Sequence, residues 1–164
     1  MPKAPTEKVI DRVHHVYHLV VSAGCTTTAT IEDALGLSHS MAYYALQLLK
    51  NNKMVVEVVL GKHAVWCVDE ETAKRSIEEL KSEVRRLLCN NGRIRYTTPK
   101  RVLELIESDK YARKVFSKHV SLGRPKRGKY KPTTLAFVDS VLRELFGEPK
   151  FQRHGERPVY FVTC

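Results

Sequence analysis

A Gly-Leu-Ser turn between two helical patterns limits the folds that the first half of this chain can adopt. Before the turn, Ile31–Leu35 has the composition of a short helix. After it, Ser38 is a favoured N-cap for a helix that runs to about Asn51 without Gly or Pro. The buried positions of this second helix would be Ala42, Leu46 and Leu49. The sequence therefore predicts a helix-turn-helix between residues 31 and 51.

Elements on both sides extend this pattern. Thr6–Ala23 has apolar residues at intervals of three and four, which predicts a helix, and Cys25–Thr28 is predicted as a turn. Met54–Leu60 and His63–Val68 are β-rich runs, and Gly61-Lys62 between them is a connection typical of a tight hairpin. The predicted order is helix, helix, turn, helix and hairpin.

This order is that of a winged helix. The stretch TIEDALGLSHSMAYYALQLLKNNKMVVEVVLGKHAVWCV resembles the winged helix-turn-helix superfamily, in the style of the MarR and ArsR regulators, and the resemblance covers Thr6–Val68. It rests on a pattern of elements rather than on an invariant motif. It implies that Ser38 opens a recognition helix and that Met54-Val55 begins the wing.

A long helix is predicted over Asp69–Asn91, with acids at its start and Asn91-Gly92 as a left-handed stop. Its apolar residues step by four and three: Ala73, Ile77, Leu80, Val84 and Leu87. This spacing fits a short coiled coil between two copies, and it fits equally an amphipathic helix packed on its own domain. We expect a winged helix-turn-helix domain over 1–68, a connecting or dimerisation helix over 69–91 and a basic helical domain over 92–164.

Three further helices are predicted in the last part. Thr98-Pro99 begins the first, Asp109–His119 forms the second and Pro132–Phe146 forms the third. The apolar residues of the second are Tyr111, Ala112, Val115 and Phe116. FQRHGERPVYFVT predicts a hairpin turning near His154-Gly155. The fold class is thus mainly α with small β-hairpins (α+β), either as one winged helix with a basic domain or as tandem winged helices joined by the long helix.

The charge of the chain is concentrated in its second half. Residues 1–75 contain eight Lys and Arg against eight Asp and Glu, so the formal net charge of +10 belongs to residues 76–164. A polyanion is the expected partner of such a surface. A membrane is not expected, because no run approaches the roughly 18 apolar residues that a spanning helix needs and the N-terminus does not resemble a signal peptide.

The densest basic segment predicts the nucleic-acid-binding residues. No acid occurs from Lys110 to Lys131, and nine cations do: Lys110, Arg113, Lys114, Lys118, Arg124, Lys126, Arg127, Lys129 and Lys131. Arg153 and Arg157 would add to them at the tip of the last hairpin. Such a surface provides sequence-independent affinity.

Part of this segment has its own resemblance. Gly123-Arg124-Pro125 resembles the core of an AT-hook, although Leu122 stands where that family usually has another Arg. The resemblance implies Arg insertion into a narrow A·T minor groove, and a generic phosphate-binding loop is the alternative. Tyr130 is a candidate for stacking on an unpaired base.

The predicted recognition helix lacks cations. Its candidates for base reading are His39, Ser40, Tyr43, Tyr44 and Gln47. Met41, Tyr44 and Leu48 form a second apolar stripe, so the helix either reads bases with neutral groups or contacts another protein. A shift of the helical phase by one residue would place the stripe in the core.

No catalytic residues or cofactor are predicted. His14, His15 and His18 lie on the first helix, but without a neighbouring carboxylate they are predicted to be a solvated or packed group rather than a metal site. The four cysteines lack CxxC spacing and are predicted to be buried free thiols. The low Asn and Gln content suits a thermophile, in which an intracellular disulfide is an alternative.

The function predicted is that of a non-enzymatic DNA-binding protein. We expect a transcriptional regulator or chromatin-associated factor that binds duplex DNA as a homodimer, in the cytoplasm on the nucleoid, or in the nucleus of a eukaryote. The alternative is a winged-helix assembly module of a replication, transcription or RNA-processing complex that binds RNA or single strands. An enzyme is a third alternative only if the chain has a catalytic site without a recognisable motif, for example a metal site at His14 and His18.

Overall fold

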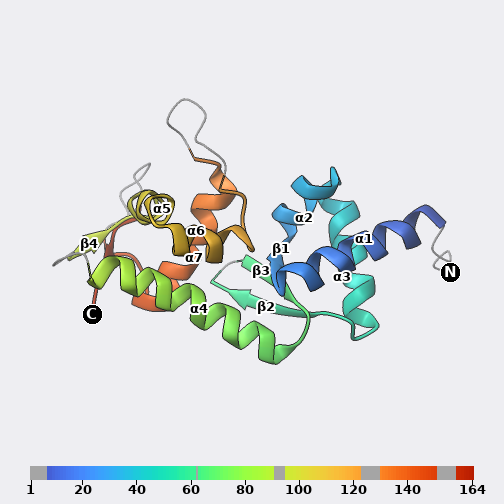
Figure 1. Cartoon of the computed structure of the whole chain (residues 1–164), viewed down its shortest axis with the longest axis horizontal. Coiled ribbons are helices and arrows are strands. Elements are labelled where there is room, and N and C mark those ends of the chain that lie inside the picture. Colours follow the sequence, from blue (N-terminus) through green and yellow to red (C-terminus); the bar gives the residue numbers. More distant parts are fainter. Residues whose placement is uncertain (1–6, 62, 91–94, 123–129, 151–157) are drawn as a thin grey trace. The chain divides into compact units, whose positions relative to one another are not determined.

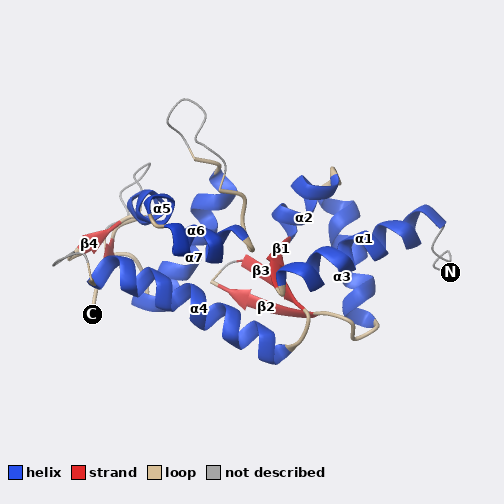
Figure 2. Cartoon of the chain, viewed as in Figure 1, coloured by secondary structure: helices blue, strands red, loops and turns tan. Residues whose placement is uncertain are grey.

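The chain forms two compact units of helices and short strands (Figures 1 and 2). The structure is a computed structural model that describes residues 7–61, 63–90, 95–122, 130–150 and 158–164. Unit 1 comprises residues 1–58 and 64–76, and unit 2 comprises residues 59–63 and 77–164. The architecture is mainly helical with small antiparallel sheets, as the sequence predicts. The division into parts at residues 68 and 91 stays a prediction.

The first unit is built from α1, β1, α2, α3 and most of a three-stranded sheet. Its elements are α1 (Glu7–Ala23), β1 (Cys25–Thr27), α2 (Thr28–Leu35), α3 (His39–Asn51), β2 (Val56–Leu60) and β3 (His63–Cys67). The strand order is β1-β3-β2, and β1 runs antiparallel to β3. The core joins Val16 and Val20 of α1 to Trp66 of β3 and to the buried face of α3. Ala42, Leu46 and Leu49 lie on that face, so the predicted phase of α3 is confirmed.

Two predictions for this unit are wrong. Cys25–Thr27 is a strand rather than part of a turn, because its three residues pair with β3 and are all buried. The next helix begins at Thr28 rather than near Ile31, since the Thr27 hydroxyl accepts a hydrogen bond from the backbone N–H of Thr30 and caps it. The turn after it is as expected: Gly36 has the left-handed φ of 64° and the Ser38 hydroxyl caps α3.

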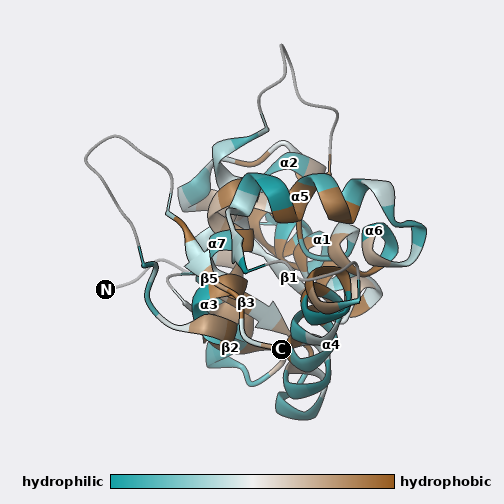
Figure 3. Ribbon diagram, turned by 90° about the vertical axis from the view of Figure 1, so that its left-hand side faces the viewer, coloured by the Kyte–Doolittle hydropathy of each residue, from teal (hydrophilic) through white to brown (hydrophobic). Residues whose placement is uncertain are grey.

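The second unit contains one long and three shorter helices. Its elements are the larger part of α4 (Glu70–Cys89), β4 (Tyr96–Thr97), α5 (Pro99–Ser108), α6 (Lys110–Ser117), α7 (Pro132–Phe146) and β5 (Tyr160–Phe161). Helix α5 packs on both α6 and α7, and β5 packs on α7. The alternating teal and brown bands along α5 in Figure 3 follow its spacing of exposed and buried residues. The predicted starts at Thr98-Pro99 and Pro132 are confirmed.

The strand β5 was predicted to pair only within a C-terminal hairpin, but it also pairs with β4. β5 pairs with β4, with Tyr96 opposite Phe161 and Thr97 opposite Tyr160. The backbone N–H of Lys150 also donates to the carbonyl of Val159 at 2.8 Å, as in a hairpin. The predicted turn at His154-Gly155 lies outside the described residues.

The apolar seam of α4 is covered within the single chain. Leu80, Val84 and Leu87 are each at most 3% exposed. A coiled coil between two copies would need these side chains on the surface of one copy. Of the two interpretations of the seam, the helix packed on its own chain is therefore the one that the structure supports.

The tip of the β2–β3 hairpin packs within the second unit. Gly61 has a φ of 60°, and a Cβ added to it would lie 2.8 Å from the Cβ of Ser140 on α7, so only glycine fits. His63 Nδ1 lies 2.9 Å from the Ser140 hydroxyl, and its ring meets the edge of Phe137. Burial lowers the pKa of His63 below its ordinary value, and the nearby Asp139 carboxylate opposes this shift.

All four cysteines form disulfides, Cys25–Cys67 and Cys89–Cys164. The prediction of free thiols is wrong because the fold brings each pair of cysteines together. Cys25 and Cys67 are direct partners across β1 and β3. The C-terminal residues return to the end of α4, where Cys164 meets Cys89. In the chain-entropy model, loops of this length give each disulfide about 4 kcal/mol of stabilisation.

The two disulfides should be reduced in a fixed order. Cys25 and Cys67 are completely buried, whereas Cys164 is exposed, so a mild reductant should open Cys89–Cys164 first. Mass spectrometry of peptides alkylated at increasing reductant concentration would measure the order. The double variant C89S/C164S should lose about 4 kcal/mol of unfolding free energy in denaturant titrations. Simultaneous labelling of all four cysteines would contradict the expected order.

Candidate nucleic-acid interface

The helix α6 separates a buried face from a cationic one. Ala112, Val115 and Phe116 are buried, at no more than 3% exposure, and Phe116 meets the edge of the Phe137 ring of α7. Four of the predicted cations lie on the other side and are exposed: Lys110, Arg113, Lys114 and the C-cap residue Lys118. We call these four the α6 face. Tyr111 is 57% exposed because it falls among these cations rather than in the apolar row.

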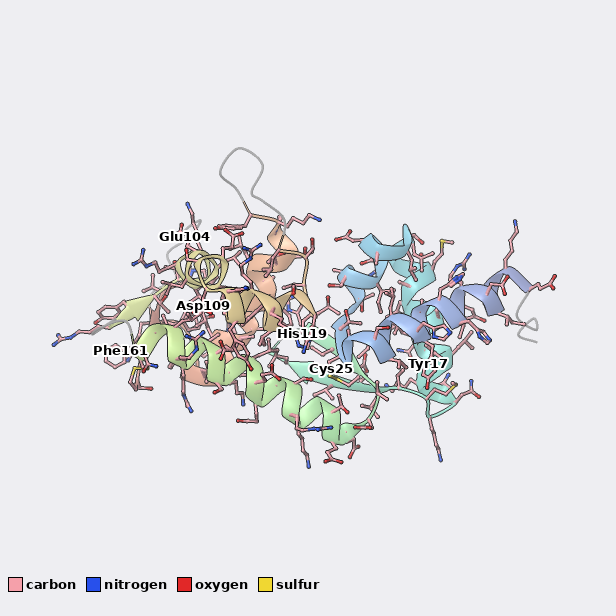
Figure 4. The ribbon with its side chains drawn as sticks, in the orientation of Figure 1. Tyr17, Cys25, Glu104, Asp109, His119 and Phe161 are labelled. Atoms are coloured by element: carbon pink, nitrogen blue, oxygen red, sulfur yellow. A yellow bond between two sulfur atoms is a disulfide. The ribbon has the colours of Figure 1, made fainter. Side chains whose placement is uncertain are left out.

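The start of α6 is fixed by a charged network. The Asp109 carboxylate accepts a hydrogen bond from the backbone N–H of Ala112 at 3.0 Å and caps the helix. Arg86 of α4 donates to Asp109 and to Glu83, both at 2.8 Å. Glu83 is only 6% exposed, so this carboxylate depends on its Arg86 partner. Figure 4 labels Asp109 where α6 begins.

The network shifts the pKa values of its members. The hydrogen bond from Arg86, and next that from the Ala112 backbone, hold the pKa of Asp109 below its ordinary range. The hydrogen bonds from Arg86 to Glu83 and Asp109 raise the pKa of the Arg86 guanidinium. Arg86 is therefore engaged in holding α6 in place.

The cations of the α6 face are available to an outside anion. In the part of the chain that the structure describes, none of Lys110, Arg113, Lys114 and Lys118 forms an ion pair with an acidic side chain. Other described cations are engaged: Lys50 lies 3.1 Å from Glu57, and Arg143 is paired with Asp139 and Glu148. The α6 face is thus a row of charges without an ion-pair partner among the described residues.

The remaining basic residues of the predicted site are only partly described. Lys131 is exposed and lies directly before α7. Arg124, Lys126, Arg127, Lys129, Arg153 and Arg157 lie outside the described residues, and so does the AT-hook-like Gly123-Arg124-Pro125. Tyr130 is half-buried, and its hydroxyl donates to Glu107 of α5 at 2.9 Å. Burial, with this hydrogen bond, raises the pKa of Tyr130 to about 12.

The α3 face, formed by the candidate base-reading residues, lacks Lys and Arg and is partly aromatic. His39, Ser40, Tyr43 and Tyr44 are exposed, while Gln47 is half-buried. His39 stacks on Tyr43, which meets the edge of the buried Trp66. The His39 ring also lies 3.4 Å from the Glu32 carboxylate. Met41 is 36% and Tyr44 46% exposed, whereas Leu48 is half-buried, so two of the three residues of the second apolar stripe lie on the surface.

No metal centre is found among the described residues, since no three His, Cys, Asp or Glu side chains gather closely enough to hold an ion. His14, His15 and His18 are exposed on α1. Helices in the described part of the chain are also too short or too polar to cross a bilayer.

A second basic stretch was missed from the sequence. Residues 84–103 contain six Lys and Arg and no acid: Arg85, Arg86, Arg93, Arg95, Lys100 and Arg101. Within it, Arg95, Tyr96 and Arg101 are exposed at or next to β4 and the start of α5. Phe161 of β5 joins Tyr96 there. The acid-free run could have drawn attention to this region, but the pairing with Phe161 has no signal in the sequence.

Fold and charge distribution together define the class: a small, mainly helical α+β protein whose second unit presents an exposed cationic helix face. The family model described as "PSV, transcriptional regulator domain" matches residues 74–161, more than half of the chain, and the chain belongs to this family. The matched range contains the α6 face.

One solved structure is similar over nearly the whole chain. It is the crystal structure of the hypothetical protein PyrSV_gp04 from Pyrobaculum spherical virus, with 27% identity, a TM-score of 0.79, and coverage of 96% of this chain and 97% of that one. Among curated proteins, none matches the chain. These similarities support a transcription-regulator-like fold.

Variants of Asp109 should separate its role as the helix cap of α6 from its role as the charged partner of Arg86. At neutral pH we expect the melting temperature to fall in the order wild type, D109N, D109A, because Asn retains the cap but loses the charge, whereas Ala loses both. Since the pKa of Asp109 is lowered in the folded state, its stabilisation is present above the ordinary pKa and is lost as pH falls below about 4. Wild type and D109N should therefore converge in acid. D11N, on the exposed surface of α1, is the control for thermal unfolding followed by circular dichroism, and equal stability of D109N and wild type at neutral pH would contradict the role of the charge.

Proposed function

We propose that this protein is a transcriptional regulator that binds duplex DNA, with the α6 face as its main contact to phosphates. The observation that carries the proposal is the row of four exposed cations on a helix whose opposite side is buried. The helix fixes the backbone positions of these four cations relative to one another. They can therefore contact neighbouring phosphates together and orient the protein on the duplex. Membership of a transcriptional-regulator family supports the regulatory role.

The charge balance supports a role in affinity rather than in sequence choice. Each phosphate neutralised on duplex DNA contributes about 0.9 to the slope of log K against log salt, so four contacts would contribute about 3.6. Lys131 and the basic residues at positions 124–129, 153 and 157 are proposed to add to this grip. We also propose that the AT-hook-like residues Gly123-Arg124-Pro125 give the protein a preference for A·T-rich duplexes.

For the first unit we propose a winged helix-turn-helix in which the α3 face reads bases. The order α1, β1, α2, α3, β2, β3 and the capped turn between α2 and α3 support this assignment. In the second unit, the strand β4 followed by α5 and α6, and the pairing of β4 with β5, repeat part of that order. We therefore propose that the two units are tandem winged helices.

Removal of the α6 charges should weaken duplex binding independently of sequence. The variant K110Q/R113Q/K114Q/K118Q should lower the magnitude of the salt slope by about 3 to 4. Fluorescence anisotropy with unrelated duplexes at several salt concentrations would measure both the affinity and the slope.

A matched variant controls for total charge. The variant K8Q/K53Q/K74Q/R75Q also removes four positive charges, but from exposed positions of unit 1. It should leave the salt slope nearly unchanged. Equal losses in the two variants would indicate that net charge, rather than the α6 face, controls binding, and an unchanged slope in the α6 variant would refute the proposed contact.

A second candidate function is that of an assembly module within a larger complex, with the first unit contacting protein. The exposed Met41, Tyr43 and Tyr44, together with the absence of Lys and Arg from residues 38–49, favour this candidate. Its basic half would then bind RNA or single strands.

The variant Y43A/Y44A distinguishes the two candidates. If the α3 face reads bases, the variant should bind all duplexes equally but lose preference for a sequence obtained by selection with the wild type. Retained preference would refute base reading by these tyrosines and favour protein contact. Selection from a random duplex pool, followed by competition binding, measures the preference.

We further propose a homodimer, bound to DNA in the cytoplasm on a nucleoid, or in the nucleus of a eukaryotic host. Because the apolar seam of α4 is buried within the chain, dimerisation would have to use another surface. A chromatin-associated role and a thermophilic source are proposals that rest on the basic charge and on the low Asn and Gln content.

A further inference from the structure

The β4–β5 ladder of unit 2 has one buried face and one exposed aromatic face. Thr97 and Tyr160, which pair with each other, are 2% and 0% exposed. The neighbouring pair, Tyr96 and Phe161, is 53% and 39% exposed, because successive side chains of a strand point to opposite faces. Figure 4 labels Phe161.

The two exposed rings lie in contact. Their centroids are 5.5 Å apart and their planes are inclined by 65°, which is an edge-to-face arrangement. The backbone beneath them is held by hydrogen bonds. The backbone N–H of Val162 donates to the carbonyl of Arg95 at 2.8 Å along the ladder, and on the buried side Tyr160 donates its hydroxyl to the Asp139 carboxylate. The ladder therefore presents the two rings on a fixed backbone.

The cross-strand contact between the two rings stabilises the ladder. Tyr96 and Phe161 nevertheless keep 53% and 39% of their surface exposed. This exposed aromatic surface is available for stacking on a ligand.

The charge around the rings indicates the kind of partner. Arg95 and Arg101 are exposed, Lys100 is half-buried, and no acid occurs between residues 84 and 103. Rings that can stack on bases, set among cations that can contact phosphates, are the two components of a surface for single-stranded nucleic acid.

We propose that Tyr96 and Phe161 form a stacking site for unpaired bases of single-stranded DNA, with Arg95 and Arg101 contacting the adjoining phosphates. The site is separate from the α6 face and goes beyond duplex binding. The choice of DNA over RNA rests on the proposed function. In a regulator, such a site would hold bases exposed where a duplex is opened.

A base-stacking assay tests this proposal directly. The probe is a single strand of about twelve thymidines carrying one 2-aminopurine, whose fluorescence is quenched when it stacks on an aromatic ring. The wild type should quench the probe. The variant Y96V/F161V introduces β-branched side chains, which suit a strand, and removes both rings. It should lose at least about fivefold in affinity for the probe together with the quenching.

The ring-swapped variant Y96F/F161Y is the matched control. It retains two rings and should retain both affinity and quenching. Thermal unfolding verifies that each variant is folded, and the single variant F161L replaces Y96V/F161V if the latter is unfolded. Unchanged probe affinity in a folded variant without the ring would overturn the proposal, as would a wild type that binds without quenching.

Two further measurements separate this site from the proposed function. Duplex affinity of Y96V/F161V should change less than about twofold, because stacked base pairs offer no free base faces. The α6 variant should retain quenching even if its duplex binding is lost. A tenfold preference for the corresponding uridine strand over the thymidine strand would overturn the assignment to DNA.

Discussion

The closure of the second unit by its last residues is the constraint on which the α6 face and the Tyr96–Phe161 site depend. Helices α5, α6 and α7 all lie in sequence between β4 and β5, and the pairing of Tyr96 with Phe161 brings the two ends of this segment together. The Cys89–Cys164 disulfide makes the closure covalent immediately beyond the ladder. Because closing a loop of this length costs entropy in the unfolded chain, the covalent link favours the state in which the three helices are already enclosed.

Within this closed unit, α6 is too short to be stable alone. A helix of eight residues lies below the length at which isolated helices persist in water, so its existence depends on packing and capping. Phe116 supplies the packing, and Asp109, held by Arg86, supplies the cap. The cations of the α6 face repel one another, and it is this support from the other side of the helix that offsets the repulsion. The same contacts that stabilise α6 therefore position its charges.

Local sequence signals predicted the elements that local interactions determine. Ser38, Thr98-Pro99 and Pro132 mark helix starts because capping and proline geometry act within a few residues. The β1 strand was missed because three residues become a strand only through their pairing with β3. The disulfides and the Tyr96–Phe161 pair were missed for the same reason: each joins residues more than 40 positions apart. Tyr111, one of the apolar residues of α6, is exposed, because a tyrosine on an amphipathic helix suits either face.

The separation of charge between the halves has a consequence for how the proposed regulator would select its target. Phosphate contacts by the α6 face would bind any duplex and would favour none, so they cannot supply selection. The α3 face carries no cation and could not hold DNA by itself, yet hydroxyl, amide and imidazole groups discriminate base edges. Once one unit holds the duplex, base contacts by the other become intramolecular, and weak contacts then gain from a high effective concentration. With phosphate contacts in one unit and base contacts in the other, the salt concentration would change the affinity for DNA but leave the discrimination between sequences largely unchanged.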